Sequence, residues 1–259
     1  MRALITNDDG IDSPGLAALA RVAAAAGLEV VVAAPAHEHS GASASIIATE
    51  GTAVTAAGGK GTVRSERRVL PGVEEAYAVH AAPALIVLLA LHGSFGAVPD
   101  VVLSGINRGA NVGSAILHSG TVGAALTAGQ GGVRALAVSL DVGLREGGDE
   151  HWETAAALAA RALPGLLSSQ PGTVHNLNVP DVDLDDGVEL VEAPLAPFGI
   201  VQTTMTEVDG DEVRLAIREH RATDAPGSDM ERLAAGLATI TALPTLVTRA
   251  GEVPGVSGR

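Results

Sequence analysis

Short apolar runs alternate with longer alanine-rich or amphipathic runs along the first 180 residues of the chain. The run 29–34 is continuously apolar, which is typical of a strand buried on both faces. The run 14–26 opens on Pro14 and is followed by Gly27, a placement of proline and glycine that predicts a helix. The same criteria predict strands at 2–6, 101–103, 135–139 and 174–179, and helices at 83–92, in a glycine-rich stretch ending near 128, and at 152–167. This alternation predicts an α/β fold, an open and mostly parallel sheet with helices on both faces.

Two segments depart from that pattern. Residues 51–80 are rich in Gly, Thr, Val and charge and predict a small β excursion from the core. Residues 181–230 carry many charges and alternating stretches such as 213–217, and we predict an extended arm or hairpin that packs on another subunit. A helix at 229–235 and a strand at 237–242 follow. We therefore expect a catalytic core over 1–180 and a C-terminal oligomerisation segment over 181–259.

Composition narrows the class of protein. Of 259 residues, 47% are hydrophobic and only 2% are aromatic, so the core is built from Ala, Val, Leu and Ile, as in parallel sheets covered by helices. With 30 acidic and 16 basic residues, the net charge of −14 opposes binding to nucleic acid polymers. It does not oppose a small phosphorylated substrate, because a bound cation can invert the local potential.

The chain has no cysteine, which excludes thiolate metal ligands and cysteine nucleophiles. Its longest aliphatic run, 84–91, is far shorter than the ~20 residues that span a bilayer. The first strand begins almost at Met1, without the apolar region of a signal peptide. We therefore expect a cytoplasmic protein without a membrane partner.

Polar side chains follow several predicted strands, and the carboxyl ends of parallel strands share one edge of the sheet. Asp8 and Asp9 come directly after the first strand, where adjacent carboxylates repel each other unless a cation lies between them. Oxygen ligands suit Mg²⁺ or Mn²⁺. The alternative is a solvated turn at the start of a helix. Ser40 follows the next predicted strand, and its hydroxyl can bind a hard metal ion or donate to a phosphate oxygen; the alternative for it is a flexible Ser/Ala loop. Asn107 follows a further predicted strand and should lie at the same edge.

Two glycine-rich stretches predict an anion site at the same edge. Residues 104–113 allow the backbone to wrap an anion, with Asn111 aimed inward. Residues 118–123 then open a helix, where hydroxyl groups and free backbone N–H groups bind phosphate. The alternatives are a closely packed helix face and an ordinary N-cap at Ser119 or Thr121.

The strings ITNDDGIDSPG, AAPAHEHSGASAS, PDVVLSGINRGANVG and HSGTVGAA occur in this order, and HNLNVP and GLATIT follow later. Together they resemble the SurE family of survival-protein nucleotidases, most strongly over residues 1–140. The resemblance implies a Rossmann-like three-layer α/β/α core and dimers or tetramers that exchange C-terminal segments. It also implies a phosphatase of nucleoside monophosphates with one divalent metal ion per subunit. The implied metal ligands are Asp8, Asp9, Ser40 and Asn107, and the implied phosphate contacts are Asn111, Ser119, Gly120 and Thr121.

The chain departs from the family pattern at His118, where Tyr is common, and in the stretch 81–85, which replaces a Gly-Thr-Pro-x-Asp segment. A protonated His118 can bind phosphate or protonate the leaving oxygen; the alternative is that it fills the space of the Tyr.

We predict metal-assisted attack of water on phosphorus, with Asp8 or Asp9 accepting the proton. The alternatives are a phosphatase that forms a covalent phosphoenzyme, a phosphatase of another small metabolite, and a non-catalytic nucleotide-binding module.

Overall fold

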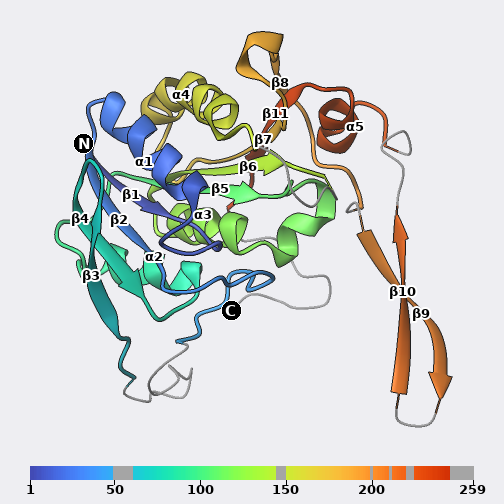
Figure 1. The fold of residues 1–259 in the computed structure, drawn as a ribbon, viewed down its shortest axis with the longest axis horizontal. Helices are drawn as coiled ribbons and strands as arrows, with labels where there is room; N and C mark the ends of the chain where they lie inside the picture. The colour runs from blue at the N-terminus through green and yellow to red at the C-terminus, as the bar shows by residue number, and fades with distance from the viewer. Residues whose placement is uncertain (49–60, 144–149, 199–200, 210–211, 220–224, 246–259) are drawn as a thin grey trace, which may run out of the picture.

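The computed structural model describes residues 1–48, 61–143, 150–198, 201–209, 212–219 and 225–245, and Figure 1 shows its fold. The core elements are β1 (Arg2–Thr6), α1 (Pro14–Ala25), β2 (Glu29–Pro35), β3 (Ser65–Leu70), β4 (Val73–Val79), α2 (Pro83–Leu91), β5 (Val101–Arg108), a 3-10 helix η1 (Gly113–His118), α3 (Gly120–Gln130), β6 (Arg134–Asp141), α4 (Trp152–Ser168) and β7 (Val174–Pro180). The C-terminal elements are η2 (Leu184–Asp186), β8 (Leu190–Glu192), β9 (Val201–Asp209), β10 (Glu212–Glu219), α5 (Asp229–Ala234) and β11 (Ala238–Leu243). Residues 51–60 of the predicted β excursion lie outside the described residues.

A nine-stranded sheet in the order β3-β4-β2-β1-β5-β6-β7-β11-β8 forms the middle of the molecule. Its neighbouring strands are parallel except for the pairs β3–β4 and β7–β11. The predicted mostly parallel sheet is therefore confirmed. Strands β3 and β4 extend this sheet at one edge, since β4 pairs with β2 in parallel.

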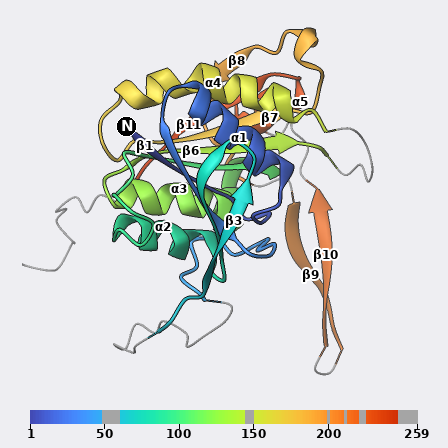
Figure 2. The ribbon, with the colours of Figure 1, turned by 60° about the vertical axis from the view of Figure 1, so that its left-hand side comes forward.

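Helices cover both faces of the sheet, as Figure 2 shows. Successive side chains of a strand point to opposite faces, and in β1 the residues Ala3 and Ile5 pack in a cluster with α1 and α4. Leu4, between them, packs in a second cluster with α2 and α3. All three side chains are fully buried. The fold is thus the expected three-layer α/β/α arrangement.

Strand β5 is longer than predicted. The sequence favours a glycine-rich loop from Ser104, but the strand continues to Arg108 through an irregularity in its pairing with β6 between Ser104 and Asn107. Gly105 lies there with φ +129, and a Cβ on it would lie 2.2 Å from the carbonyl oxygen of Val138. Glycine therefore permits a close approach of β5 to β6, and Asn107 is held on a strand of the sheet.

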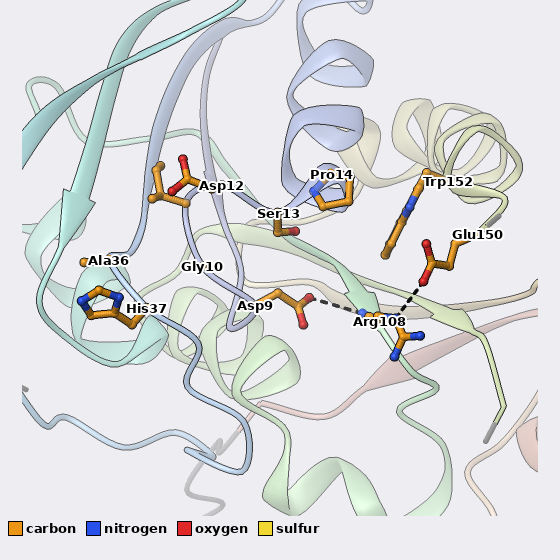
Figure 3. A pocket seen from close by; sticks show the side chains of 11 residues that line it. Asp9, Gly10, Asp12, Ser13, Pro14, Ala36, His37, Arg108, Glu150 and Trp152 are labelled. Atoms are coloured by element: carbon orange, nitrogen blue, oxygen red, sulfur yellow. Dashed lines mark hydrogen bonds and ion pairs between the residues drawn. The ribbon is translucent and has the colours of Figure 1, made fainter. Parts of the chain in front are cut away.

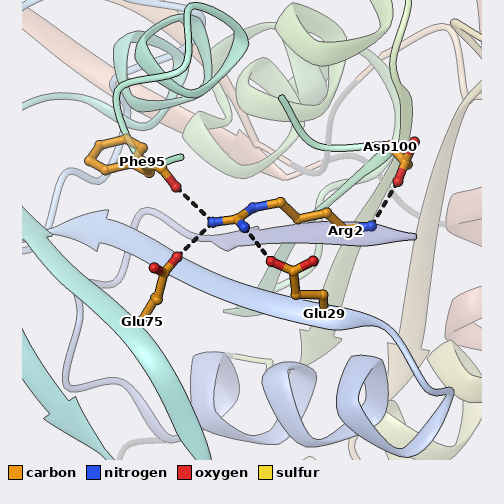
Figure 4. Close-up of polar contacts among 5 residues, drawn as sticks. All are labelled: Arg2, Glu29, Glu75, Phe95 and Asp100. Carbon is orange, nitrogen blue, oxygen red and sulfur yellow. Dashed lines mark hydrogen bonds and ion pairs between the residues drawn. The ribbon is translucent and has the colours of Figure 1, made fainter. Parts of the chain in front are cut away.

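At the amino ends of the strands, several contacts converge on the largely buried side chain of Arg2 (Figure 4). Its guanidinium pairs with Glu29 of β2 and, at 2.6 Å, with Glu75 of β4. The guanidinium also donates to the carbonyl of Phe95, while the backbone N–H of Arg2 donates to Asp100. These contacts join β1, β2 and β4 near their amino ends. The candidate site residues lie at the other end of the strands, the carboxyl end.

Strands β9 and β10 form a separate antiparallel pair that stands away from the body of the molecule in both views. This hairpin lies within the predicted arm 181–230, but β8 of the same segment pairs with β11 in the main sheet, so the arm is shorter than predicted. After it the chain returns through α5 to β11, close to the predicted helix and strand, and β11 joins the main sheet. Within the described ranges, none of the helices combines the length and apolar character that a membrane crossing needs.

Candidate metal and phosphate site

The turn after β1 presents Asp8 and Asp9 at the carboxyl edge of the sheet. The buried Asn7 closes this turn, because its amide donates to the carbonyl of Gly10 at 3.0 Å and accepts from the N–H of Gly10 at 3.2 Å. Gly10 has φ +101, a conformation that glycine adopts readily. The sequence Asn-Asp-Asp-Gly thus fixes the position of both carboxylates.

The start of α3 holds Asp8. The hydroxyl of Thr121 donates to Asp8 Oδ1, and the backbone N–H of Thr121 donates to Asp8 Oδ2 at 3.1 Å. Gly120 leaves room for this contact, because a Cβ there would lie 2.8 Å from Asp8 Oδ2. Burial raises the pKa of Asp8, and the Thr121 hydroxyl and N–H oppose that rise.

Asp9 lies beside it in a less enclosed position. Burial raises the pKa of Asp9 to about 6, the negative charge of Asp8 adds to the rise, and the N–H of Arg108, 3.3 Å from Asp9 Oδ2, opposes it. Two adjacent carboxylates are therefore held where ionising both is unfavourable without a nearby positive charge.

A cavity of about 390 Å³ gathers the predicted residues. Its lining includes all four predicted metal ligands, Asp8, Asp9, Ser40 and Asn107, and three of the predicted phosphate contacts, Asn111, His118 and Ser119. Residues that the sequence reasoning missed, Glu38 and Arg108, also line it. The four candidate ligands offer only oxygen atoms, the donor set that hard divalent cations prefer, and these residues fit such an ion.

A cation in this cavity would need uncharged ligands in addition to the two aspartates. Within the part of the chain that the structure describes, no three His, Cys, Asp or Glu side chains are grouped to bind a metal. A cation at Asp8 and Asp9 would therefore also depend on Ser40 and Asn107. The amide nitrogen of Asn107 donates to the carbonyl of Gly109 at 2.7 Å, and this bond fixes which end of the amide is the oxygen.

The loop with Ser40 is attached directly to the aspartate turn. The N–H of His39 donates to the backbone carbonyl of Asp8 at 2.7 Å. The Ser40 hydroxyl donates to Glu38 at 2.5 Å. Glu38 thus orients the serine, and its only signal in the sequence is an acidic residue two positions before Ser40.

Asn111 is held by the distant motif HNLNVP. The amide groups of Asn176 and Asn178 donate to the carbonyl of Asn111 at 2.8 and 3.0 Å, and Asn178 accepts from the Asn111 N–H at 2.7 Å. The side-chain amide of Asn111 donates to Ser139 at 2.8 Å. The second N–H of that amide group can serve a ligand. Asn176 and Asn178 are supporting residues that we did not predict, although their motif is part of the family resemblance.

Ser119, Gly120 and Thr121 have different surroundings. Ser119 is the N-cap of α3, and its oxygen accepts from the N–H of Val122 at 3.1 Å, so its O–H can still donate into the cavity. Thr121 is fully buried against Asp8. Gly120 and Thr121, predicted as phosphate contacts, are thus placed against Asp8, while the exposed His118 lines the cavity.

The sequence and the fold are similar to those of known proteins. The model of the family described as "Survival protein SurE" matches residues 3–197. A protein of Methanopyrus kandleri named 5'-nucleotidase SurE is 37% identical over 96% of this chain and 93% of its own length. One of the same name from Hyphomonas neptunium is 36% identical over 80% of this chain and 78% of its length. The crystal structure of the SurE protein from Aquifex aeolicus superimposes with a TM-score of 0.71 at 26% identity, covering 94% of this chain and 93% of that one. The chain therefore belongs to the survival protein SurE family.

Proposed function

We propose that the protein is a metal-dependent phosphatase that hydrolyses nucleoside 5′-monophosphates to nucleoside and phosphate. The observation that carries this proposal is the cavity in which the adjacent carboxylates of Asp8 and Asp9 meet a hydroxyl and an amide from two other segments. The names of the relatives, 5'-nucleotidase SurE, support the same reaction and substrate class.

One Mg²⁺ or Mn²⁺ ion per subunit would be held by Asp8, Asp9, Ser40 and Asn107. When bound, such an ion polarises phosphate oxygens and lowers the pKa of a water molecule. The acidic side chains Asp8, Asp9 and Glu38 would otherwise repel a phosphate dianion from this cavity. A metal ion would therefore assist substrate binding as well as the reaction.

The surroundings of the two carboxylates indicate which one accepts the proton of the attacking water. Both oxygens of Asp8 accept hydrogen bonds from Thr121. Among the described residues, Asp9 accepts from the N–H of Arg108 on Oδ2 alone. Asp9 Oδ1 is therefore the better placed base, and Asp8 is the more rigid anchor.

Polar donors around the cavity would bind the transferred phosphate. The side chains of Asn111 and Ser119 each retain a hydrogen-bond donor, and His118 is exposed at the rim. Donors already fixed in place stabilise the charge that develops on phosphate oxygens in the transition state.

A comparison of substrates tests the reaction class. Phosphate release from a nucleoside monophosphate should depend on Mg²⁺ or Mn²⁺ and stop with EDTA, whereas bis(p-nitrophenyl) phosphate, a diester, should be cleaved slowly or not at all. Preferential diester cleavage, or hydrolysis that persists in EDTA, would contradict the proposal. Trapping of an acid-stable phosphoenzyme would favour covalent catalysis, and binding without turnover would favour a nucleotide-binding module.

We also propose a homodimer or homotetramer in which the β9–β10 hairpin packs on another subunit. An isolated two-stranded hairpin is at best marginally stable in water. A partner surface would supply the contacts that this hairpin lacks where it stands away from its own body (Figure 1).

A further inference from the structure

A second cavity, of about 410 Å³, adjoins the metal and phosphate site (Figure 3). Its volume lies in the range of about 300–1,000 Å³ that is usual for small-molecule sites. Asp9 and Arg108 line both cavities, so the two spaces meet at these residues. A ligand that fills both cavities would therefore pass Asp9 and Arg108.

One wall of this cavity is the indole of Trp152, the first residue of α4. Figure 3 shows the ring between Pro14 and Glu150, directed into the space. The ring also packs against the start of α1, since a Cβ on Gly15 would lie 2.8 Å from Trp152 Cζ3. The indole is thus held in a fixed orientation and is available for stacking with a planar group.

Two ion pairs engage charged groups of the cavity, one of them with a residue outside it. Arg108 Nε lies 2.9 Å from Glu150 Oε1, and Asp12 pairs with Arg68 of β3 at 2.6 Å. With Asp9 added, three carboxylates line the space, and they disfavour a second phosphate group. They suit a neutral group with N–H and O–H donors. An aromatic wall with nearby carboxylate acceptors matches a nucleoside.

We propose that this cavity binds the nucleoside part of the substrate, with the base stacked on Trp152. This inference rests on the proposed nucleotidase function and extends it. The ester oxygen would lie near Asp9, where the cavities meet, and Trp152 would favour nucleotides over simple phosphate esters.

Trp152 is the only tryptophan of the chain, so its fluorescence reports on this cavity alone. We expect adenosine, in the presence of Mg²⁺ and inorganic phosphate, to change the emission of the full-length protein in a saturable way. Inorganic phosphate with Mg²⁺ but without adenosine should not. Emission that stays constant up to the solubility limit of adenosine would overturn the inference. No turnover is required for this measurement.

Substitution of Trp152 tests its effect on specificity. Stacking of a base on an aromatic ring contributes enough that Trp152→Ala should lower kcat/KM for adenosine monophosphate, relative to that for glycerol phosphate, by about tenfold or more. The change should arise mainly in KM. Trp152→Phe should restore most of the ratio. Leu167→Ala is the matched control, because Leu167 is another partly buried side chain of α4 that packs on the same core cluster; it should leave the ratio unchanged.

The outcomes separate this inference from the proposed function. A wild-type protein that hydrolyses neither ester would contradict the function itself. If both esters are hydrolysed and the ratio of kcat/KM for adenosine monophosphate to that for glycerol phosphate is the same in wild type and Trp152→Ala, the proposed function is supported and the nucleoside site is overturned. An equal loss of the ratio in Leu167→Ala would show a general effect of helix α4 and would also overturn it.

Discussion

Asp9 must be ionised to bind a cation, but its surroundings in the metal-free protein disfavour ionisation. Its carboxylate is placed to bind a cation and accept a proton, but burial and the charge of Asp8 raise its pKa from 3.8 to about 6. The folded protein without metal therefore binds this proton more tightly than the unfolded chain does. Ionisation of Asp9 therefore lowers the free energy of unfolding. This decrease is absent below about pH 4, grows between about pH 4 and 6, and is constant above that range.

We therefore predict that Asp9→Asn raises the stability of the metal-free protein. In EDTA, the free energy of unfolding of Asp9→Asn should exceed that of wild type by up to about 3 kcal/mol at neutral pH, at 1.36 kcal/mol for each pKa unit. The difference should disappear as the pH falls to about 4. Urea denaturation at several pH values measures it. A wild type that is more stable than Asp9→Asn at neutral pH would contradict the raised pKa of Asp9.

His118 lines the phosphate cavity at a position where the family resemblance leads us to expect tyrosine. It is exposed and lines the cavity, and a histidine can gain a proton between about pH 5 and 8 whereas a tyrosine cannot. We predict that wild type has a higher kcat/KM at the acidic end of this range, relative to the alkaline end, than His118→Tyr has. Superimposable pH profiles would mean that His118 only fills space.

The start of helix α3 is the element whose position matters most for the site. Alanine usually stabilises a helix relative to glycine by about 1 kcal/mol. Gly120→Ala should do the opposite, because the new Cβ would lie 2.8 Å from Asp8 Oδ2 and 2.9 Å from Asp8 Cβ. We predict a lower Tm and a lower kcat for this variant.

Gly165→Ala in α4 is the control for that prediction. The added Cβ meets no atom within 4 Å there, so this variant should gain about 0.5–1 kcal/mol of stability and keep its activity. Equal stabilisation by both substitutions would show that Gly120 has no special contact with Asp8.

Most elements could be predicted because each depends on local pattern. The apolar run 29–34 and the Pro14–Gly27 boundaries fixed one strand and one helix nearly to the residue, as the observed β2 and α1 confirm. The continuation of β5 through Gly105 could not be predicted, since glycine there serves a close approach to Val138 on a neighbouring strand. Glycine in a loop and glycine at a strand irregularity have the same local signature.

The grouping of the candidate site residues could also be predicted in part. Strand ends placed Asp8, Asp9 and Ser40 at one edge, and the cavity does bring them together. The contacts of Thr121 with Asp8 and of Asn178 with Asn111 join residues 113 and 67 positions apart. Such pairs depend on helix and strand packing across the whole sheet, and a single sequence does not reveal them.

At the scale of the whole molecule, the proposed assembly assigns the contact between subunits to the β9–β10 hairpin. We predict that light scattering at micromolar concentration gives a dimer or tetramer. Replacement of 201–219 by a short Gly-Ser linker should reduce the mass to that of one subunit, or expose the chain to proteolysis, because the partner contacts are lost. A monomeric intact protein would contradict the proposed assembly.

The central claim is that Asp8 and Asp9 form a metal site for hydrolysis of phosphate monoesters. Metal ions contribute several kcal/mol to transition-state stabilisation, so Asp8→Asn and Asp9→Asn should each lower kcat by at least about 100-fold. Their circular dichroism spectra should match that of wild type. The exposed Asp185, in η2, provides a control, and Asp185→Asn should remain active.

The most direct measurement is phosphate release from a nucleoside 5′-monophosphate by these four proteins at saturating Mn²⁺, before and after EDTA. The account predicts release by wild type and Asp185→Asn that EDTA abolishes and added Mn²⁺ restores, with almost none from the Asp8 and Asp9 variants. Wild-type turnover in either Asp8→Asn or Asp9→Asn would contradict it.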